Sequence, residues 1–135
     1  MADQKLIAEL GDGPYPCILT TLREDGSPYG VVVWCGREDG RFTVNSDESS
    51  RWLANVRRDP RVALVIVDTD NILRHLGIDG RVVSIEPDDE YAHIDSLSQI
   101  YMGRPYGWAR PGEIDKYKLT IEPVRARTTD IPLPS

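Results

Sequence analysis

Residues 16–45, PCILTTLREDGSPYGVVVWCGREDGRFTVN, contain three short runs rich in β-branched and aromatic residues, separated by two turns. Each turn, EDGS at 24–27 and REDG at 37–40, contains an Asp-Gly pair, which is typical of the tight turn of a β-hairpin. We therefore expect three antiparallel strands, at residues 16–22, 29–35 and 41–45, arranged as a meander.

The rest of the chain predicts further strands and helices around this meander. The expected helices lie at residues 3–10, 49–58 and 88–102, and the further strands at 62–67, 76–85 and 117–121, the last extending towards Arg127. The run 62–67 is almost entirely apolar, which predicts a strand buried on both faces, and Gly80 predicts a bulge in the next strand. Because no βαβ alternation is present, a doubly wound sheet is excluded. A mainly β fold, a closed antiparallel barrel with helices at its ends, fits best.

Length and composition indicate one small domain. The chain has 135 residues, with 16 Lys and Arg against 22 Asp and Glu, so its net charge is -6. We expect a domain over residues 1–128 and a loose tail over 129–135, where two prolines disfavour helix and interior strand. The acidic charge argues against a nucleic-acid partner. No apolar run of ~20 residues is present, which argues against a membrane partner, and the acidic start is not a signal peptide, so the expected location is cytoplasmic.

The sequence offers few groups for acid–base chemistry. It has no Gly-rich phosphate loop, no HExxH and no GxSxG, and the two cysteines form no CxxC pair, so no metal site is expected. Of the two histidines, His93 is expected on a solvated helix face, and His75, at a strand start, is a candidate for a substrate pocket. Cys17 and Cys35 are expected as reduced, buried thiols, with a redox pair as the alternative. An enzyme of this composition would rely on a bound cofactor.

Residues 42–60 contain the strongest candidate for a binding site. A helix N-terminus attracts anions, and Ser49, Ser50 and Arg51 would add two hydroxyl donors and a forked cation there. Arg51, Asn55 and Arg58 share one helical face. The alternative interpretation is a capped amphipathic helix with a solvated basic face. The cluster has no aromatic platform for stacking RNA bases.

This stretch resembles the pyridoxamine 5'-phosphate oxidase-like split-barrel superfamily, and is most similar to its actinobacterial branch of flavin- and deazaflavin-binding reductases. The resemblance extends over most of the chain and includes TTL at 20–22, DGSP at 25–28, VW at 33–34, Asn45, SR at 50–51, NVRRDPRV at 55–62, residues 68–71, GRV at 80–82, HID at 93–95 and YMG at 101–103. It implies a homodimer of six-stranded antiparallel split β-barrels, with two cofactor clefts at the subunit interface.

The resemblance also implies where a cofactor would lie. Its phosphate would bind the segment 49–51, and its ring would lie along the strands containing residues 32–34 and 43–45. With neighbouring helix residues, the predicted cofactor-binding set is Val32, Val33, Trp34, Thr43, Val44, Asn45, Ser49, Ser50, Arg51, Trp52, Asn55 and Arg58. Trp52 departs from the family pattern, since many members have Lys after the arginine. The missing cation favours coenzyme F420, which has a phosphodiester and an extended acidic tail, over FMN.

The expected function is hydride transfer from reduced F420 to a small organic substrate. The alternatives are an FMN-dependent oxidoreductase of the same fold and a flavin or deazaflavin carrier without turnover. Hydride transfer requires alignment and exclusion of water more than a strong base, in agreement with the shortage of histidines. No catalytic residue is identified. The predicted substrate-pocket residues are His75, Tyr101, Tyr106 and Trp108, of which the three aromatic residues either cover the pocket or anchor a dimer interface.

Overall fold

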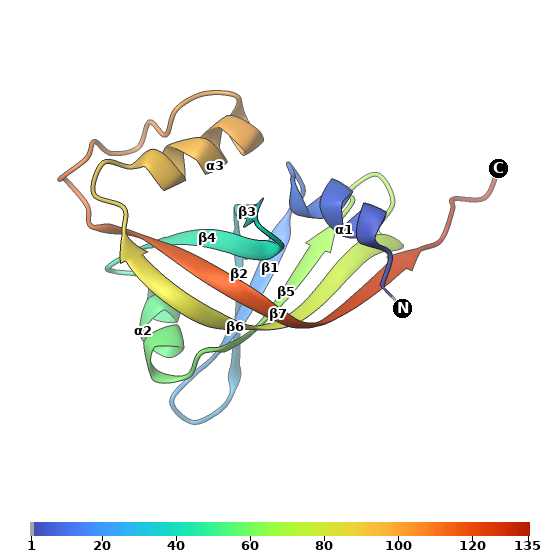
Figure 1. Ribbon diagram of the computed structural model, residues 1–135, viewed down its shortest axis with the longest axis horizontal. Coiled ribbons are helices and arrows are strands. Elements are labelled where there is room, and N and C mark those ends of the chain that lie inside the picture. Colours follow the sequence, from blue (N-terminus) through green and yellow to red (C-terminus); the bar gives the residue numbers. More distant parts are fainter. Residues whose placement is uncertain (1) are drawn as a thin grey trace.

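Residues 2–135 are described in a computed structural model, whose secondary structure is mainly strand (Figure 1). The elements in chain order are α1 (Gln4–Gly11), β1 (Cys17–Leu22), β2 (Pro28–Val33), β3 (Cys35–Glu38), β4 (Arg41–Asp47), α2 (Arg51–Arg58), β5 (Arg61–Val67), β6 (Arg74–Pro87), α3 (Ala92–Met102) and β7 (Lys116–Asp130). All strand pairs are antiparallel, in the order β2-β1-β5-β6-β7-β4-β3. The mainly β, split-barrel fold is confirmed, with seven strand segments in place of the expected six.

The extra segment arises because the chain changes pairing partner at Trp34. β2 pairs with β1 at one edge of the sheet, and β3 pairs with β4 at the other. Val33 ends β2 and Cys35 begins β3, so Trp34 alone joins the two edges and the sheet closes into a barrel. Both Asp-Gly hairpins are confirmed. The uninterrupted meander is wrong, because the expected strand 29–35 divides between the two edges to close the barrel.

The interior of the barrel is filled by alternate residues of the strands and closed by two helices. α1 contributes Leu6, Ile7 and Leu10 to the core, while α2, packed against β1, contributes a second group that includes Trp52 and Leu53. Asp3 caps the start of α1, and its carboxylate accepts the backbone N–H groups of Lys5 and Leu6 at 3.0 and 3.2 Å. None of the helices formed by residues 2–135 is both long and apolar enough to cross a lipid bilayer.

Strands β5 and β6 correct one expectation and confirm another. β5 buries Val62, Leu64 and Ile66, but Val65 between them is 37% exposed. The prediction of burial on both faces is therefore wrong, because the outer face of the barrel is open at Val65. The bulge is confirmed, since the β6–β7 register shifts between Asp79 and Gly80. A Cβ on Gly80 would lie 2.8 Å from a backbone oxygen of β7, a separation too short for any side chain.

Helix α3 is shorter than predicted, and the last strand is longer. Tyr91 precedes α3 in a left-handed conformation with φ of 61°, so the helix begins at Ala92. Its inner face buries Ile94, Leu97 and Ser98. β7 continues through Asp130, which pairs with Arg74 on β6. Residues 131–135, after β7, contain neither helix nor strand.

Candidate functional site

A cavity of about 310 Å³ lies where β2 ends, between α2 and α3. Its lining is mostly apolar, and its residues are Val31, Val32, Val33, Trp34, Asn45, Trp52, Ile94, Leu97 and Tyr106. Val32 is 71% exposed, an unusual degree for a valine in a strand. We call this space the β2 cavity. A flat apolar molecule would find a valine floor here and one fixed polar group, the amide of Asn45.

The structure brings part of the predicted ring-binding set together in the β2 cavity. Five of the predicted residues line it: Val32, Val33, Trp34, Asn45 and Trp52. Thr43 and Val44 do not, because Val44 is fully buried in the barrel core and Thr43 is 2% exposed. Sequence analysis also missed Ile94 and Leu97 as lining residues. The apolar spacing of residues 94 and 97 in helix α3 is the sequence signal that could have identified them.

The start of α2 has two features suited to an anion, although one predicted donor is already used. The N–H of Ser49 donates to the Asp47 carboxylate at 2.9 Å, and its hydroxyl donates to the same oxygen. Ser50 precedes the helix, and its side chain makes no capping hydrogen bond. Arg51 is exposed and pairs with no carboxylate among residues 2–135. The uncapped helix end and the unpaired guanidinium of Arg51 can therefore hold an anion beside Trp52.

Two residues predicted to bind the cofactor instead attach α2 to the barrel. The amide nitrogen of Asn55 donates to the Thr21 hydroxyl at 3.0 Å, inside the protein. Arg58 donates to the Asn55 side-chain oxygen at 3.1 Å and to the backbone oxygen of Leu22 at 2.9 Å. These contacts use both ends of the Asn55 amide, so Asn55 and Arg58 support the position of α2 against the barrel.

Arg57, the remaining arginine of α2, is paired within the protein. Its guanidinium lies 3.0 Å from the Glu48 carboxylate and 5.2 Å from the centre of the Tyr117 ring. The hydrogen bond from Arg57 lowers the pKa of Glu48. Of the three arginines of this helix, Arg57 is therefore the one neutralised by a carboxylate, whereas Arg51 and Arg58 pair with none among residues 2–135 and Arg58 donates to neutral oxygen atoms.

A buried polar cluster beneath α3 orients Asn45. The Asp88 carboxylate accepts the backbone N–H groups of His93 and Ile94 at 3.0 and 2.9 Å. A carboxylate only accepts hydrogen bonds, so the Asn45 side chain turns its amide nitrogen, the donor, towards Asp88 at 3.1 Å. The same nitrogen lies 3.0 Å from Nδ1 of His93. The Asn45 side chain is thus held in a single orientation beside the β2 cavity.

His93 is buried, contrary to the prediction of a solvated position. Only 8% of His93 is exposed, and burial lowers its pKa to about 4, a change that the nearby Asp88 only partly offsets. Its Nδ1 accepts from Asn45, so the ring is neutral and carries its proton on Nε2. The spacing of apolar residues in α3 did not predict the burial of His93, because this burial depends on Asp88. The Asp88 carboxylate binds two N–H groups at the start of α3 and the Asn45 amide on β4, and so holds the helix against that strand.

The aromatic residues predicted for the substrate pocket form a chain of contacts around Trp34. The rings of Tyr101 and Trp34 are stacked, with centroids 5.7 Å apart, and the Trp108 ring lies 6.2 Å from Trp34 and 5.4 Å from Tyr106. Trp108 remains 64% exposed. His75 does not belong to this group. Its Nδ1 lies 2.9 Å from the backbone oxygen of residue 72, within its own turn, and His75 lies outside the lining of the β2 cavity.

Tyr101 has a structural role in addition to its place in this aromatic group. Its hydroxyl donates to the Tyr15 backbone oxygen at 2.8 Å and accepts the Cys35 N–H at 3.1 Å. Burial raises the pKa of Tyr101. The phenol thus fixes the point at which the chain crosses between the barrel edges. Cys35 and Cys17 are free and buried, and the neighbouring Cys35 thiol together with burial raises the pKa of Cys17.

Comparisons with known proteins agree with this architecture. Residues 4–128 match a family model described as pyridoxamine 5'-phosphate oxidase. Among solved structures, the chain is similar to an F420 reductase, with a TM-score of 0.80 and 25% identity over 88% of this chain and 94% of that one. It is also similar to a conserved hypothetical protein from Mycobacterium tuberculosis, with a TM-score of 0.78 and 24% identity over 100% of this chain and 92% of that one.

A more distant likeness shows the fold alone. General Stress Protein 26 from Bacillus anthracis has a TM-score of 0.70 and 20% identity, over 93% of this chain and 92% of that one. No curated protein matches the sequence. Because the family model covers residues 4–128, nearly the whole chain, the protein belongs to the pyridoxamine 5'-phosphate oxidase family.

Proposed function

We propose that the protein binds a flavin-type cofactor in the β2 cavity, and that it acts as an oxidoreductase which transfers a hydride from reduced F420 to a small organic molecule. The observation that carries this proposal is the apolar β2 cavity directly beside an uncapped helix end and the unpaired Arg51. The 25% identity with an F420 reductase supports the choice of cofactor. FMN is the alternative cofactor.

The residues around the β2 cavity fit the two parts of such a cofactor. Val32 and Val33 offer an apolar surface for a tricyclic ring, while the side-chain oxygen of Asn45, which has no hydrogen-bond partner among residues 2–135, is left to accept from the polar ring edge. Arg51 and the free N–H groups of α2 fit a phosphate. Trp52 is 5% exposed and forms a cavity wall, so it adds apolar contact and no charge. One cation suits the phosphodiester of F420 better than the dianionic phosphate of FMN.

When bound, the cofactor would supply the hydride chemistry, and the chain would supply binding and orientation. Neither buried candidate for proton transfer is available. The His93 ring is neutral and enclosed, and the Tyr101 hydroxyl is held between two backbone groups. We therefore propose that solvent supplies the proton that accompanies the hydride. This accounts for a site without a conventional acid or base.

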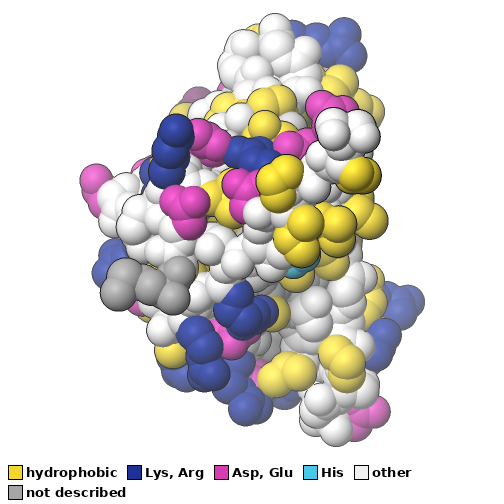
Figure 2. Space-filling model, turned by 90° about the vertical axis from the view of Figure 1, so that its right-hand side faces the viewer, with side chains coloured by type: hydrophobic (Ala, Val, Ile, Leu, Met, Phe, Trp, Pro, Cys, Tyr) yellow, Lys and Arg dark blue, Asp and Glu magenta, His cyan; other side chains and the backbone are white. Residues whose placement is uncertain are grey.

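We further propose that two copies of the chain associate through the outer face of β2, β1 and β5. Val32, Ile18 and Val65 lie side by side across these strands, and Val32 and Val65 are exposed. Figure 2 shows further apolar side chains gathered on one end of the molecule, and Figure 1 places the β5–β6 turn at the same end. This turn contains Ile72 and Leu73, both of which are exposed. Association would cover this surface and complete the β2 cavity.

The dimer proposal is tested by sedimentation equilibrium. The native protein should show about twice the chain mass of 15.2 kDa, because a self-complementary apolar face is buried in a two-fold pair. Val65→Glu introduces a charge on the outer face without disturbing the barrel interior, and should yield the monomer. A native protein with the mass of a single chain would refute the association.

The cofactor proposal is tested by titrating the purified protein with F420 and with FMN while following cofactor fluorescence. Loss of a charged hydrogen bond costs about 1.5–3 kcal/mol, so Arg51→Ala should weaken binding by about 10- to 100-fold. Arg125→Ala is the matched control, since Arg125 is 71% exposed, lies on β7 and pairs with Asp79. Equal affinities for the native protein and Arg51→Ala would overturn the placement of the phosphate.

Turnover is tested separately from binding. The protein should accelerate the reoxidation of reduced F420 when an organic acceptor is added. Binding of F420 without acceptor-dependent reoxidation, across a broad panel of acceptors, would favour the carrier function.

A further inference from the structure

A second cavity, of about 410 Å³, shares the wall formed by Val32, Val33 and Trp34 with the β2 cavity. Its other lining residues come from three segments that are distant in the sequence. Pro14 and Pro16 lie between α1 and β1, Thr69 lies in the β5–β6 turn, and Tyr101 lies in α3. We call this space the Trp34 cavity. Because the shared wall is only a few residues long, ligands in the two cavities would be neighbours.

The lining of the Trp34 cavity selects against charge. Of the residues 2–135 that the structure describes, none that lines this cavity carries a charge. The hydroxyl of Tyr101 is engaged with Tyr15 and Cys35, so Tyr101 offers a ligand only its ring. A carboxylate or ammonium group would lose the part of its hydration shell that the cavity wall displaces without gaining an ionic partner, which is a net cost.

The aromatic wall of the Trp34 cavity favours a flat ligand. The rings of Trp34 and Tyr101 are inclined to each other by only 14°, with centroids 5.7 Å apart. Two nearly parallel rings leave aromatic edges and an outer face that a further planar group can contact by offset stacking or edge-to-face packing. Proline and valine side chains supply the remaining apolar surface.

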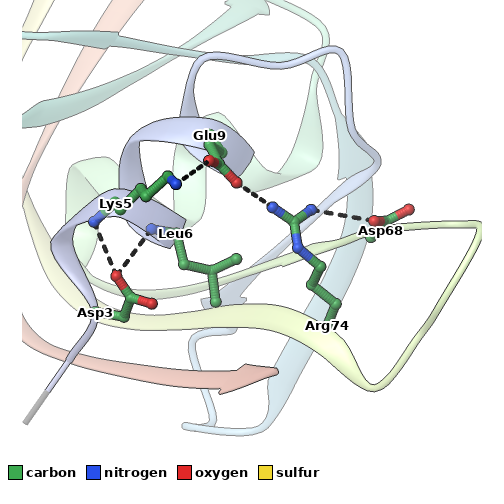
Figure 3. A network of polar contacts seen from close by, with 6 residues as sticks. All are labelled: Asp3, Lys5, Leu6, Glu9, Asp68 and Arg74. Carbon is green, nitrogen blue, oxygen red and sulfur yellow. Dashed lines mark hydrogen bonds and ion pairs between the residues drawn. The ribbon is translucent and has the colours of Figure 1, made fainter. Parts of the chain in front are cut away.

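An ionic network holds the turn that contributes Thr69 (Figure 3). The Asp68 carboxylate lies 3.1 Å from Nη1 of Arg74 and accepts the Asp70 N–H at 2.9 Å. Arg74 also pairs with Glu9 on α1. The side chains of Asp68 and Arg74 are 15% and 19% exposed, so this pairing is largely shielded from solvent. The wall that carries Thr69 is therefore held in place before any ligand arrives, which reduces the entropy lost on binding.

We propose that the Trp34 cavity binds the hydride acceptor, and that the acceptor is an uncharged, flat, conjugated organic molecule. Its role as acceptor rests on the proposed function, whereas its binding does not. In the reaction, the acceptor receives a hydride from the reduced cofactor at one end of a conjugated double bond and a proton from solvent at the other. The double bond is reduced by two electrons and the cofactor is oxidised by two.

The selectivity against charge is tested with a matched pair of planar probes, 2-naphthamide and 2-naphthoate. They have the same ring skeleton, but only the second is charged at pH 7. Equilibrium dialysis against the purified full-length protein should give an affinity for 2-naphthamide at least about tenfold higher, because the carboxylate would be desolvated without a partner. Equal binding, or tighter binding of 2-naphthoate, would overturn the proposal.

The location is tested by two substitutions of Thr69, which is exposed in its turn and so tolerates replacement. Thr69→Trp fills the Trp34 cavity and should weaken 2-naphthamide binding at least about tenfold, whereas the matched control Thr69→Ala should change it by less than about threefold. Both variants should bind F420 as the native protein does. Unchanged naphthamide binding by Thr69→Trp would refute the assignment. If neither F420 nor FMN binds, the proposed function fails, while the naphthamide results still decide the cavity.

Discussion

The hydroxyl of Tyr101 stabilises the crossing between the two edges of the barrel, and its removal is the most direct test of this closure. Tyr101→Phe keeps the ring, and with it the stacking on Trp34. It removes the acceptor of the Cys35 N–H and the donor to the Tyr15 backbone oxygen. Cys35 is only 1% exposed, so water does not readily replace the lost partner of its N–H.

The expected cost follows from these two unpaired groups. A buried polar group left without a partner costs about 1–3 kcal/mol, and the half-buried Tyr15 oxygen is expected at the lower end of that range. Tyr101→Phe should therefore reduce the free energy of unfolding by about 2–4 kcal/mol. A domain of this size has about 5–15 kcal/mol in total, so the loss is large.

Urea unfolding followed by far-UV circular dichroism measures this difference. The midpoint should fall while the slope stays constant, because the surface exposed on unfolding is the same. Tyr29→Phe is the matched control, since no hydrogen bond of the Tyr29 hydroxyl occurs within residues 2–135. It should change stability by less than about 0.5 kcal/mol. A similarly small change in Tyr101→Phe would show that the phenol does not hold the crossing.

Two further predictions concern a buried ring and a bulge. The pKa of His93 is about 4 in the folded protein and 6.5 when exposed. Its contribution to stability is thus complete above pH 6.5 and is lost as the pH falls towards 4, by about 2–3 kcal/mol between pH 7.5 and 4.5. Urea unfolding at both pH values should show a smaller loss in His93→Gln, and an equal loss would contradict the assignment. Gly80→Ala places a Cβ 2.8 Å from the Glu122 backbone oxygen and should cost about 1–3 kcal/mol in thermal unfolding. Gly30→Ala, whose Cβ finds its nearest neighbour at 4.0 Å, should be nearly neutral, and matching midpoints for the two variants would refute the close packing.

The features that the sequence predicted correctly are those set by neighbouring residues. The two Asp-Gly pairs specify their hairpins because a tight turn depends on the few residues that form it. The bulge at Gly80 follows from equally local chemistry, since only glycine fits the close approach of the two strands there. Part of the candidate site was predictable for the same reason, since Val32, Val33 and Trp34 are consecutive and line both cavities.

The roles of several polar residues depended on partners that are distant in the chain. Asn55 was predicted to bind a cofactor, yet its partner Thr21 lies 34 positions earlier. His93 was expected in solvent, yet it meets Asn45 beneath α3. A helical pattern records which residues share a face, but it contains no information about the polar group that this face will contact.

By itself, the sequence determined the hairpins, the helices, the antiparallel β class and the basic segment that contains Arg51. Only the tertiary structure decided that the chain crosses the barrel at Trp34, and that Pro14, Thr69 and Tyr101 meet around a second cavity. The physical reason is that turns and helix faces depend on contacts within a few residues. Barrel closure and cavity walls depend instead on which distant segments pack together, and this is settled by the free energy of the whole folded chain.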